Sequence, residues 1–231
     1  MTEPGRIFGV FYEPGKVFAD LAEKPRWIVP LILGMLTGLI FVNAINTRIG
    51  WDQIVRKQIM SNARTADMPA ADREVAIQRG AKVGSIIGWV GAVVGGPFFC
   101  LIVAGVLTGL FNALLGTDLR FAQAFSITAY GFVIRQLYSL LLILVMYLKP
   151  PEEFDLRVSP FSPAAYMNAQ DNPKWLMATM GTLDLFTFWV LIVLAIGFSV
   201  AARKISFTKS LITIGIPWLL VAIAGIITQS L

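Results

Sequence analysis

The sequence predicts an all-α protein, a polytopic transmembrane helical bundle with about five spans and amphipathic helices at the membrane interface. Of its 231 residues, 56% are apolar and only 14% are charged, against roughly 25% charged in ordinary soluble domains. The apolar residues form long blocks separated by short charged stretches, the pattern expected where lipid contacts most side chains. We therefore divide the chain into an interfacial segment, residues 1–26, and a transmembrane domain, residues 27–231.

The N-terminal segment carries too many charges to span a membrane. Val17, Phe18 and Leu21 recur at helical spacing, and Asp20 stands between them. Such a pattern is typical of an amphipathic helix. We expect the segment to lie in the membrane interface and to bind membrane by itself. A helix packed against the protein's own loops fits the same pattern.

Five apolar blocks are long enough for a hydrocarbon core of about 30 Å, which takes about 20 helical residues. The first begins at Trp27, whose indole favours the headgroup level. Glycines and Pro97 interrupt the second block, and we expect one tilted or kinked helix there. Thr182 is a candidate cap for the fourth. The predicted spans are about 27–46, 83–115, 132–148, 183–202 and 210–229.

The connection over residues 47–82 is polar, with seven basic and four acidic side chains. We predict two helices with solvated faces, about 51–63 and 69–81. Asp67 and Pro69 mark the start of the second helix as its cap and its early-turn proline.

Two further connections have different characters. Residues 120–130 predict a half-polar helix, and Gly131 follows it before the third span. Residues 149–174 hold five of the twelve prolines in the chain. They predict an extended surface loop.

Three stretches combine aromatic, glycine and charged residues in a distinctive order. The first is Arg6 to Pro14 with Phe18, Lys24 to Trp27 and Pro30; the second is Gly116 to Phe121 with Ala124, Ala129 and Tyr130; the third is Leu183 to Phe186 with Trp189, Gly197, Arg203, Lys204 and Lys209. Together they cover nearly the whole chain and resemble the bacterial branch of the Yip1-domain family. One departure is that Gly131 to Ile134 stand where the family usually has a proline.

The resemblance implies five spans, a cytosolic N-terminus and no catalytic residues. Eukaryotic members of the family are linked to vesicle trafficking and small GTPases. Bacteria lack that machinery, so the resemblance does not carry the trafficking role to this chain.

The sequence contains no enzyme motif: no glycine-rich phosphate loop, no His-Glu-x-x-His, no cysteine pair and no Gly-x-Ser-x-Gly. Histidine is absent and Cys100 is the single cysteine. Three acids, Glu152, Glu153 and Asp155, cluster on the proline-rich loop, which does not hold two carboxyl groups in fixed geometry. We predict no catalytic residue, no cofactor, no metal site and no enzymatic activity.

Two charged residues near membrane depth are the candidate lipid or polar intramembrane contacts. We place Arg135 about 9 Å inside one face of the core, within reach of a snorkelling side chain. It is an interfacial anchor or, alternatively, either a buried charge in a polar pathway or a contact to a lipid phosphate. Asp184 lies in the first turn of the fourth span, where a carboxylate caps the helix and meets its positive dipole end.

Basic residues give a weak signal for orientation. With a cytosolic N-terminus, the inside segments hold eight basic residues and the outside segments ten, with Arg135 uncounted. Arg203, Lys204 and Lys209 lie in a short loop, and short loops weigh most in the positive-inside rule. We therefore expect an integral protein of the bacterial cytoplasmic membrane with a cytosolic N-terminus and an exoplasmic C-terminus.

The function predicted is a non-enzymatic membrane protein that organises the bilayer or partner proteins. The partners we expect are the lipid bilayer, including anionic lipids, and other proteins or further copies of the chain, but no nucleic acid. The alternative is a small channel or the membrane subunit of a transporter, motivated by the interrupted second span and Arg135. A lipid-modifying enzyme fits worst, because the chain has no histidine.

Overall fold

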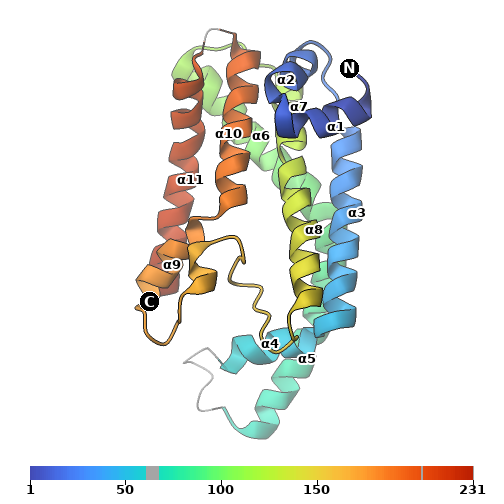
Figure 1. The fold of residues 1–231 in the computed structure, drawn as a ribbon, viewed down its shortest axis with the longest axis vertical. Coiled ribbons are helices and arrows are strands. Elements are labelled where there is room, and N and C mark those ends of the chain that lie inside the picture. The colour runs from blue at the N-terminus through green and yellow to red at the C-terminus, as the bar shows by residue number, and fades with distance from the viewer. Residues whose placement is uncertain (61–67, 204, 231) are drawn as a thin grey trace. The chain divides into compact units, whose positions relative to one another are not determined.

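A computed structural model describes residues 1–60, 68–203 and 205–230 (Figure 1). Every regular element in these residues is helical. Five helical runs are long and apolar enough to cross a membrane, which confirms the predicted fold class. These candidate spans are Ile28–Ile49, Ala70–Leu115, Phe121–Leu148, Leu185–Ala202 and Phe207–Gln229.

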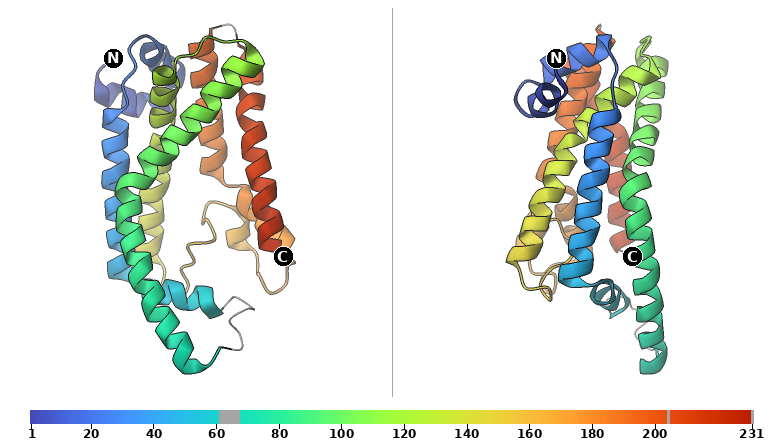
Figure 2. Two further views of the ribbon diagram at one scale, coloured as in Figure 1. Left: turned by 180° about the vertical axis from the view of Figure 1, so that it is seen from behind. Right: turned by 90° about the vertical axis from the view of Figure 1, so that its right-hand side faces the viewer.

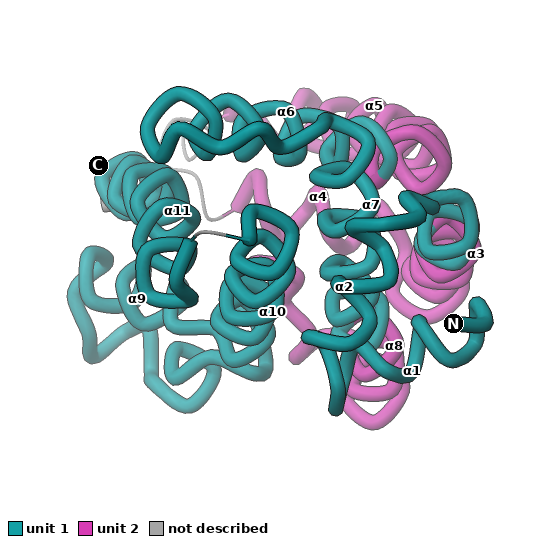
Figure 3. Tube along the Cα trace, turned by 90° about the horizontal axis from the view of Figure 1, so that it is seen from above, with its two compact units in different colours: residues 1–34, 97–138, 158–231 teal, residues 35–96, 139–157 magenta. Residues whose placement is uncertain are grey.

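The chain folds into two compact units, coloured separately in Figure 3. Unit 1 consists of Met1–Gly34, Pro97–Tyr138 and Val158–Leu231. Unit 2 consists of Met35–Gly96 and Ser139–Arg157.

Unit 1 begins with two short helices, α1 (Glu3–Tyr12) and α2 (Pro14–Glu23). Both have a proline in the first turn, where its missing N–H is no loss. The apolar face of α2 is fully buried through Val17, Phe18 and Leu21. It packs on helices α7 and α10 of the same unit. The predicted amphipathic helix is present, with its apolar face on the protein's own helices. Membrane binding by the isolated segment stays a prediction.

The central helix of unit 1 is α7 (Phe121–Gly131), where the sequence predicted a half-polar helix. The predicted helix is present, but every residue from Ala124 to Gly131 is buried, and the helix belongs to the third candidate span, which was expected to begin near residue 132. The hydroxyls of Ser126 and Thr128 donate to carbonyl oxygens one turn back, each at 2.8 Å. Because the helix itself satisfies these hydroxyls, they can be buried without an external partner. A single turn at Phe132 joins α7 to α8 (Val133–Leu148) in one candidate span.

Three longer helices complete unit 1. Helix α6 (Gly96–Leu115) buries Cys100 and Ala104 in a cluster with Phe125 and Ala129 of α7. Helices α10 (Leu185–Ala202) and α11 (Phe207–Ser230) lie side by side. The Phe111 ring of α6 contacts the Phe198 ring of α10, with 4.9 Å between centroids.

The predicted loop over residues 149–174 leads into a helix that the sequence did not predict, α9 (Lys174–Thr182). Thr182 is the last residue of α9, so it does not cap the fourth span as expected. Turns and a short 3₁₀ helix, η4 (Pro163–Tyr166), precede α9. They are ordered against the protein, since Ser162 and Ala164 are buried.

Unit 2 is built on close packing between α4 (Trp51–Met60) and α5 (Ala70–Val90). The first candidate span, α3 (Ile28–Ala44) with the π-helical turn η1 (Ile45–Ile49), leads into α4. Glycines at four-residue spacing on α5, Gly80, Gly84 and Gly88, face α4. A Cβ at Gly88 would stand 2.6 Å from the Trp51 ring, so small residues are needed there.

The second candidate span is one helical run of 46 residues, Ala70–Leu115 (Figure 2). The sequence predicted a separate helix before it, about 69–81, and this separation was wrong. The interruption expected near Pro97 appears as a π-helical turn, η3 (Gly91–Gly95), which the helix accommodates without ending. Pro69 is the N-cap residue of α5. The predicted cap Asp67 lies outside the described residues.

Candidate functional site

A buried arginine joins the two N-terminal helices. Arg6 of α1 is only 3% exposed. Its Nη1 donates to Glu3 Oε1 at 2.7 Å, and its Nε and Nη2 reach Asp20 Oδ2 of α2 at 2.7 and 2.6 Å. The N-terminal ammonium lies 3.1 Å from the other carboxylate oxygen of Asp20. The two contacts to Asp20 hold α1 against α2, and the contact to Glu3 lies within α1.

The same network reaches α7. The Tyr130 hydroxyl, on a fully buried side chain, donates to Glu3 Oε2. Arg26 Nη1 lies 3.6 Å from Glu3 Oε1. Gln123 Nε2 of α7 also donates to the Ala22 carbonyl of α2, at 2.7 Å. We call Glu3, Arg6, Asp20 and Tyr130 the Arg6 network.

The charges of the network stabilise one another. Burial raises the pKa of Asp20, but hydrogen bonds and charge from the N-terminal ammonium and Arg6 outweigh burial and hold that pKa below its ordinary value. Burial lowers the pKa of Arg6, while Asp20 and Glu3 raise it above its ordinary value. The contribution of Asp20 to stability is therefore present above a carboxyl pKa of about 4. It is lost only as the pH falls through the lower folded value.

Close packing completes the attachment of α2. A Cβ at Gly197 of α10 would stand 2.4 Å from Ile127 of α7 and 3.1 Å from the Phe18 ring of α2. A glycine is thus needed where the three helices meet. Farther along α10, the rings of Phe11 and Trp189 meet edge to face, 5.8 Å apart. The N-terminal helices are held by charge on one side and by packing on the other.

Asp184, a candidate contact predicted from the sequence, is the N-cap residue of α10 and is 8% exposed. Its Oδ1 accepts from the Thr187 N–H at 2.9 Å, and its Oδ2 accepts from the Ser159 hydroxyl at 2.5 Å. These are the bonds of a helix cap, which is the structural role predicted.

Replacing Asp184 by alanine is expected to lower the free energy of unfolding by about 0.5–2 kcal/mol, the usual cost of a lost cap. Asp184→Asn keeps an oxygen acceptor for the Thr187 N–H and should lose much less. Denaturant unfolding in detergent micelles measures both variants. Equal losses would show that the carboxylate charge, and not the cap, matters.

The second candidate, Arg135, is exposed in the first turn of α8. It lies five residues beyond Tyr130, about 7.5 Å along a helix, and Tyr130 donates to Glu3 in the Arg6 network. The guanidinium is therefore within snorkelling reach of the charged end of unit 1. The structure does not bring Arg135 and Asp184 together as one site: Asp184 hydrogen-bonds Ser159 and Thr187.

Arg135→Lys is expected to change stability by less than about 0.5 kcal/mol, because lysine keeps the charge and the long stem that reaches the interface. Both side chains carry one positive charge to the interface. Thermal unfolding in detergent, with and without added anionic lipid, measures the change. A large loss in the lysine variant would make Arg135 a binding residue whose planar fork is required.

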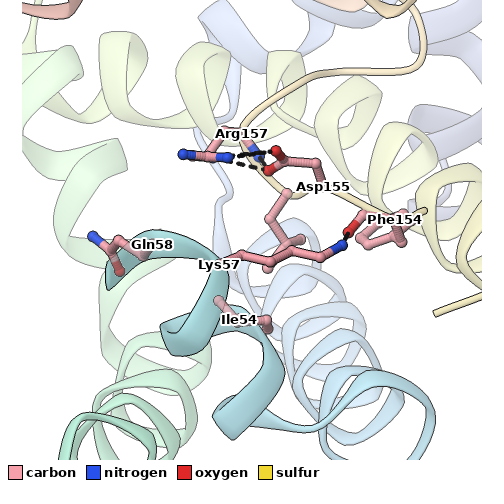
Figure 4. A pocket seen from close by; sticks show the side chains of 7 residues that line it. Ile54, Lys57, Gln58, Phe154, Asp155 and Arg157 are labelled. Carbon is pink, nitrogen blue, oxygen red and sulfur yellow. Dashed lines mark hydrogen bonds and ion pairs between the residues drawn. The ribbon is translucent and has the colours of Figure 1, made fainter. Parts of the chain in front are cut away.

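Unit 2 has its own polar cluster, shown in Figure 4. Lys57 of α4 donates to the carbonyl oxygens of Glu152 and Phe154, at 2.5 and 2.9 Å. Arg157 pairs with Asp155 at 2.8 Å, and its hydrogen bonds hold the pKa of that carboxyl below its ordinary value. Lys57, Phe154, Asp155 and Arg157 line a cavity of about 130 Å³. The bonds of Lys57 fix the loop on α4. The Asp155 carboxylate faces the guanidinium of Arg157 and not a second carboxyl group.

The comparisons with known proteins identify the family. A family model described as the Yip1 domain matches residues 8–228. The chain belongs to the Yip1 family. A similar protein is "Membrane protein YknW" of Bacillus subtilis (strain 168), 23% identical over 232 residues, or 99% of this chain and 93% of that one. No solved structure matches the chain at a significant level.

The residues that carried the Yip1 resemblance meet in the structure. Arg6 and Phe18 come from the first stretch, Tyr130 from the second and Gly197 from the third, and all lie where α1 and α2 attach. Sequence reasoning missed the network because its members are far apart in the chain. The available signal was the spacing of Glu3 and Arg6, which allows an ion pair within one helical turn.

Within residues 1–60, 68–203 and 205–230, no group of three or more side chains is placed to hold a metal ion.

Proposed function

We propose that this Yip1 protein is a non-enzymatic membrane scaffold that organises the bilayer or partner proteins through its N-terminal helices. The observation that carries the proposal is the Arg6 network, which fixes α1 and α2 on the bundle. On the opposite side of α1, Phe8 and Tyr12 are 63% and 70% exposed. A surface that is already ordered binds without the entropic cost of ordering it. Such a fixed aromatic face suits a binding protein.

Cross-linking in native membranes followed by mass spectrometry tests the scaffold role. Proteins and lipids joined to the wild-type chain should be lost in the double variant Phe8→Ser, Tyr12→Ser and in Arg6→Met. They should be kept in Lys16→Met, which alters only an exposed ion pair with Glu13. The same set of adducts in all variants would contradict the proposal. Ion or solute flux through proteoliposomes would favour the channel alternative.

The proposed orientation places the N-terminus in the cytosol of a bacterium. In support, α1, α2, the α6–α7 connection and the α10–α11 connection lie at one end of unit 1 (Figure 1). Their basic residues, among them Lys16, Arg120 and Arg203, would then face the cytosol together, as the positive-inside rule favours.

A C-terminal alkaline phosphatase fusion is therefore expected to be active, and a C-terminal green fluorescent protein fusion dark. The phosphatase folds only outside the cytosol and the fluorescent protein only inside it. The reverse pair of results would invert the topology.

A further inference from the structure

A pocket of about 340 Å³ opens at the basic end of unit 1. It is lined by the α6–α7 connection, including Asp118 and Arg120, and by the end of α10, including Arg203. Candidate spans end at Leu115 and Ala202 and another begins at Phe121. The pocket therefore lies where helices leave the hydrocarbon core, at the level of lipid headgroups.

The loop that forms one wall is fixed in place. Asn112 of α6 accepts hydrogen bonds from the Thr117 hydroxyl and the Leu119 N–H, at 2.8 and 2.9 Å, and donates to the Leu119 carbonyl at 2.9 Å. Gly116 ends α6 with φ +61°, a conformation that glycine adopts without strain. The Arg120 N–H donates to the Gln123 side chain at 3.0 Å. The backbone between the two helices is thus held by side chains.

The pocket offers charges of both signs. Among the residues that the structure describes, Asp118, Arg120 and Arg203 form no ion pair. All three side chains are exposed. Helix dipoles add to this pattern, since α7 begins at the pocket with its positive end while α6 and α10 end there with carbonyl groups.

Arg203 carries a backbone strain that points to a role. It has φ +53° and ψ −37° as the C-cap residue of α10, a backbone conformation that residues other than glycine rarely adopt. Among the described residues it is the only one other than glycine with positive φ. Strained residues of this kind gather at ligand sites, where the required side chain outweighs the cost.

We propose that this pocket binds the phosphoethanolamine headgroup of a phospholipid. Arg120, Arg203 and the start of α7 receive the phosphate, and Asp118 with the carbonyl ends of α6 and α10 receives the ammonium. A primary ammonium has three donors for these acceptors. A quaternary choline has none, and a glycerol headgroup has no positive charge. This lipid site goes beyond the scaffold role and does not depend on it.

Native mass spectrometry of the full chain in detergent tests the proposal by titration with phosphatidylethanolamine, phosphatidylcholine or phosphatidylglycerol. We expect phosphatidylethanolamine to bind at least about 10-fold more tightly than the other two, the factor that corresponds to 1.4 kcal/mol. Inorganic phosphate and soluble phosphoethanolamine are each tested as competitors of the bound lipid. If inorganic phosphate competes as well as soluble phosphoethanolamine, the site recognises phosphate alone and the proposal is wrong.

Variants separate the two halves of the site. Arg203→Gly should weaken phosphatidylethanolamine roughly 10-fold, as expected for one lost charge-assisted hydrogen bond. Because glycine relieves the strain, the same variant should unfold at the wild-type temperature or above in lipid-free detergent, so lost binding is not lost folding. Asp118→Asn should abolish the preference for phosphatidylethanolamine over phosphatidylglycerol.

Arg79→Gln, at an exposed arginine of α5, is the control and should bind phosphatidylethanolamine as the wild type does. Preference unchanged in Asp118→Asn, or stronger binding of phosphatidylglycerol by the wild type, would overturn the proposal.

Discussion

Arg6→Met is expected to lower the free energy of unfolding by about 2–4 kcal/mol and to release α1 and α2 from the bundle. Removing one partner from a buried ion pair typically costs about 3–5 kcal/mol, because the remaining charges are left unpaired. Glu3 and Asp20 are 26% and 23% exposed. Water reaches them in part, so the expected cost is slightly lower. Denaturant unfolding in detergent measures it.

Two further variants define the cause of this loss. Arg6→Lys keeps the charge but loses the fork that contacts Glu3 and Asp20 at once, and it should fall between wild type and Arg6→Met. Lys16→Met removes an ion pair from a lysine side chain that is 73% exposed, and should change stability by less than about 0.5 kcal/mol. Equal stability of Arg6→Met and Lys16→Met would show that the Arg6 network does not hold the helices.

Gly197→Ala is expected to destabilise the chain by about 1–3 kcal/mol, the usual cost of an extra methyl in a packed core. The added Cβ would stand 2.4 Å from Ile127, so α7 or α10 has to move. The Phe18 ring, 3.1 Å away, blocks the other side. Thermal unfolding of the variant in detergent measures the effect.

Gly109→Ala is the matched control. Gly109 lies in α6, and a Cβ there would meet no atom within 4 Å. Replacing a helical glycine by alanine at an open site gains about 0.5–1 kcal/mol through lost freedom of the unfolded chain. The two substitutions are therefore expected to have opposite signs. A stabilising Gly197→Ala would contradict the packing of α2, α7 and α10.

The spans were predictable because each is a long apolar block, and lipid imposes that requirement locally on the sequence. The boundaries of the spans were less predictable where polar side chains form their hydrogen bonds with the backbone of their own helix. Ser126 and Thr128 made α7 look half-polar and separate from the third span, although both hydroxyls bond to carbonyls of α7 itself and α7 belongs to that span. Helix α9 was missed because it follows the proline-rich loop. Its last residue, Thr182, was taken for the cap of the fourth span.

The candidate site was predictable only where its chemistry is local. The cap role of Asp184 follows from its place one residue before a span, and the structure confirms that role. The Arg6 network depends on pairs 14 and 127 residues apart. No period or spacing in a single sequence reveals such pairs. The charges of residues 1–26 looked like the polar face of a surface helix, while in the structure several of them neutralise one another.

The central claim is that α1 and α2 are docked on the helices of unit 1 through their buried faces. A photoreactive phenylalanine analogue at Phe11 tests this claim most directly, because the Phe11 ring contacts Trp189 of α10. In native membranes, mass spectrometry should find this probe joined to residues 185–202 of the same chain. The same analogue at the exposed Phe8 should give no such product. Attachment of the Phe11 probe to lipid alone would contradict the docked arrangement.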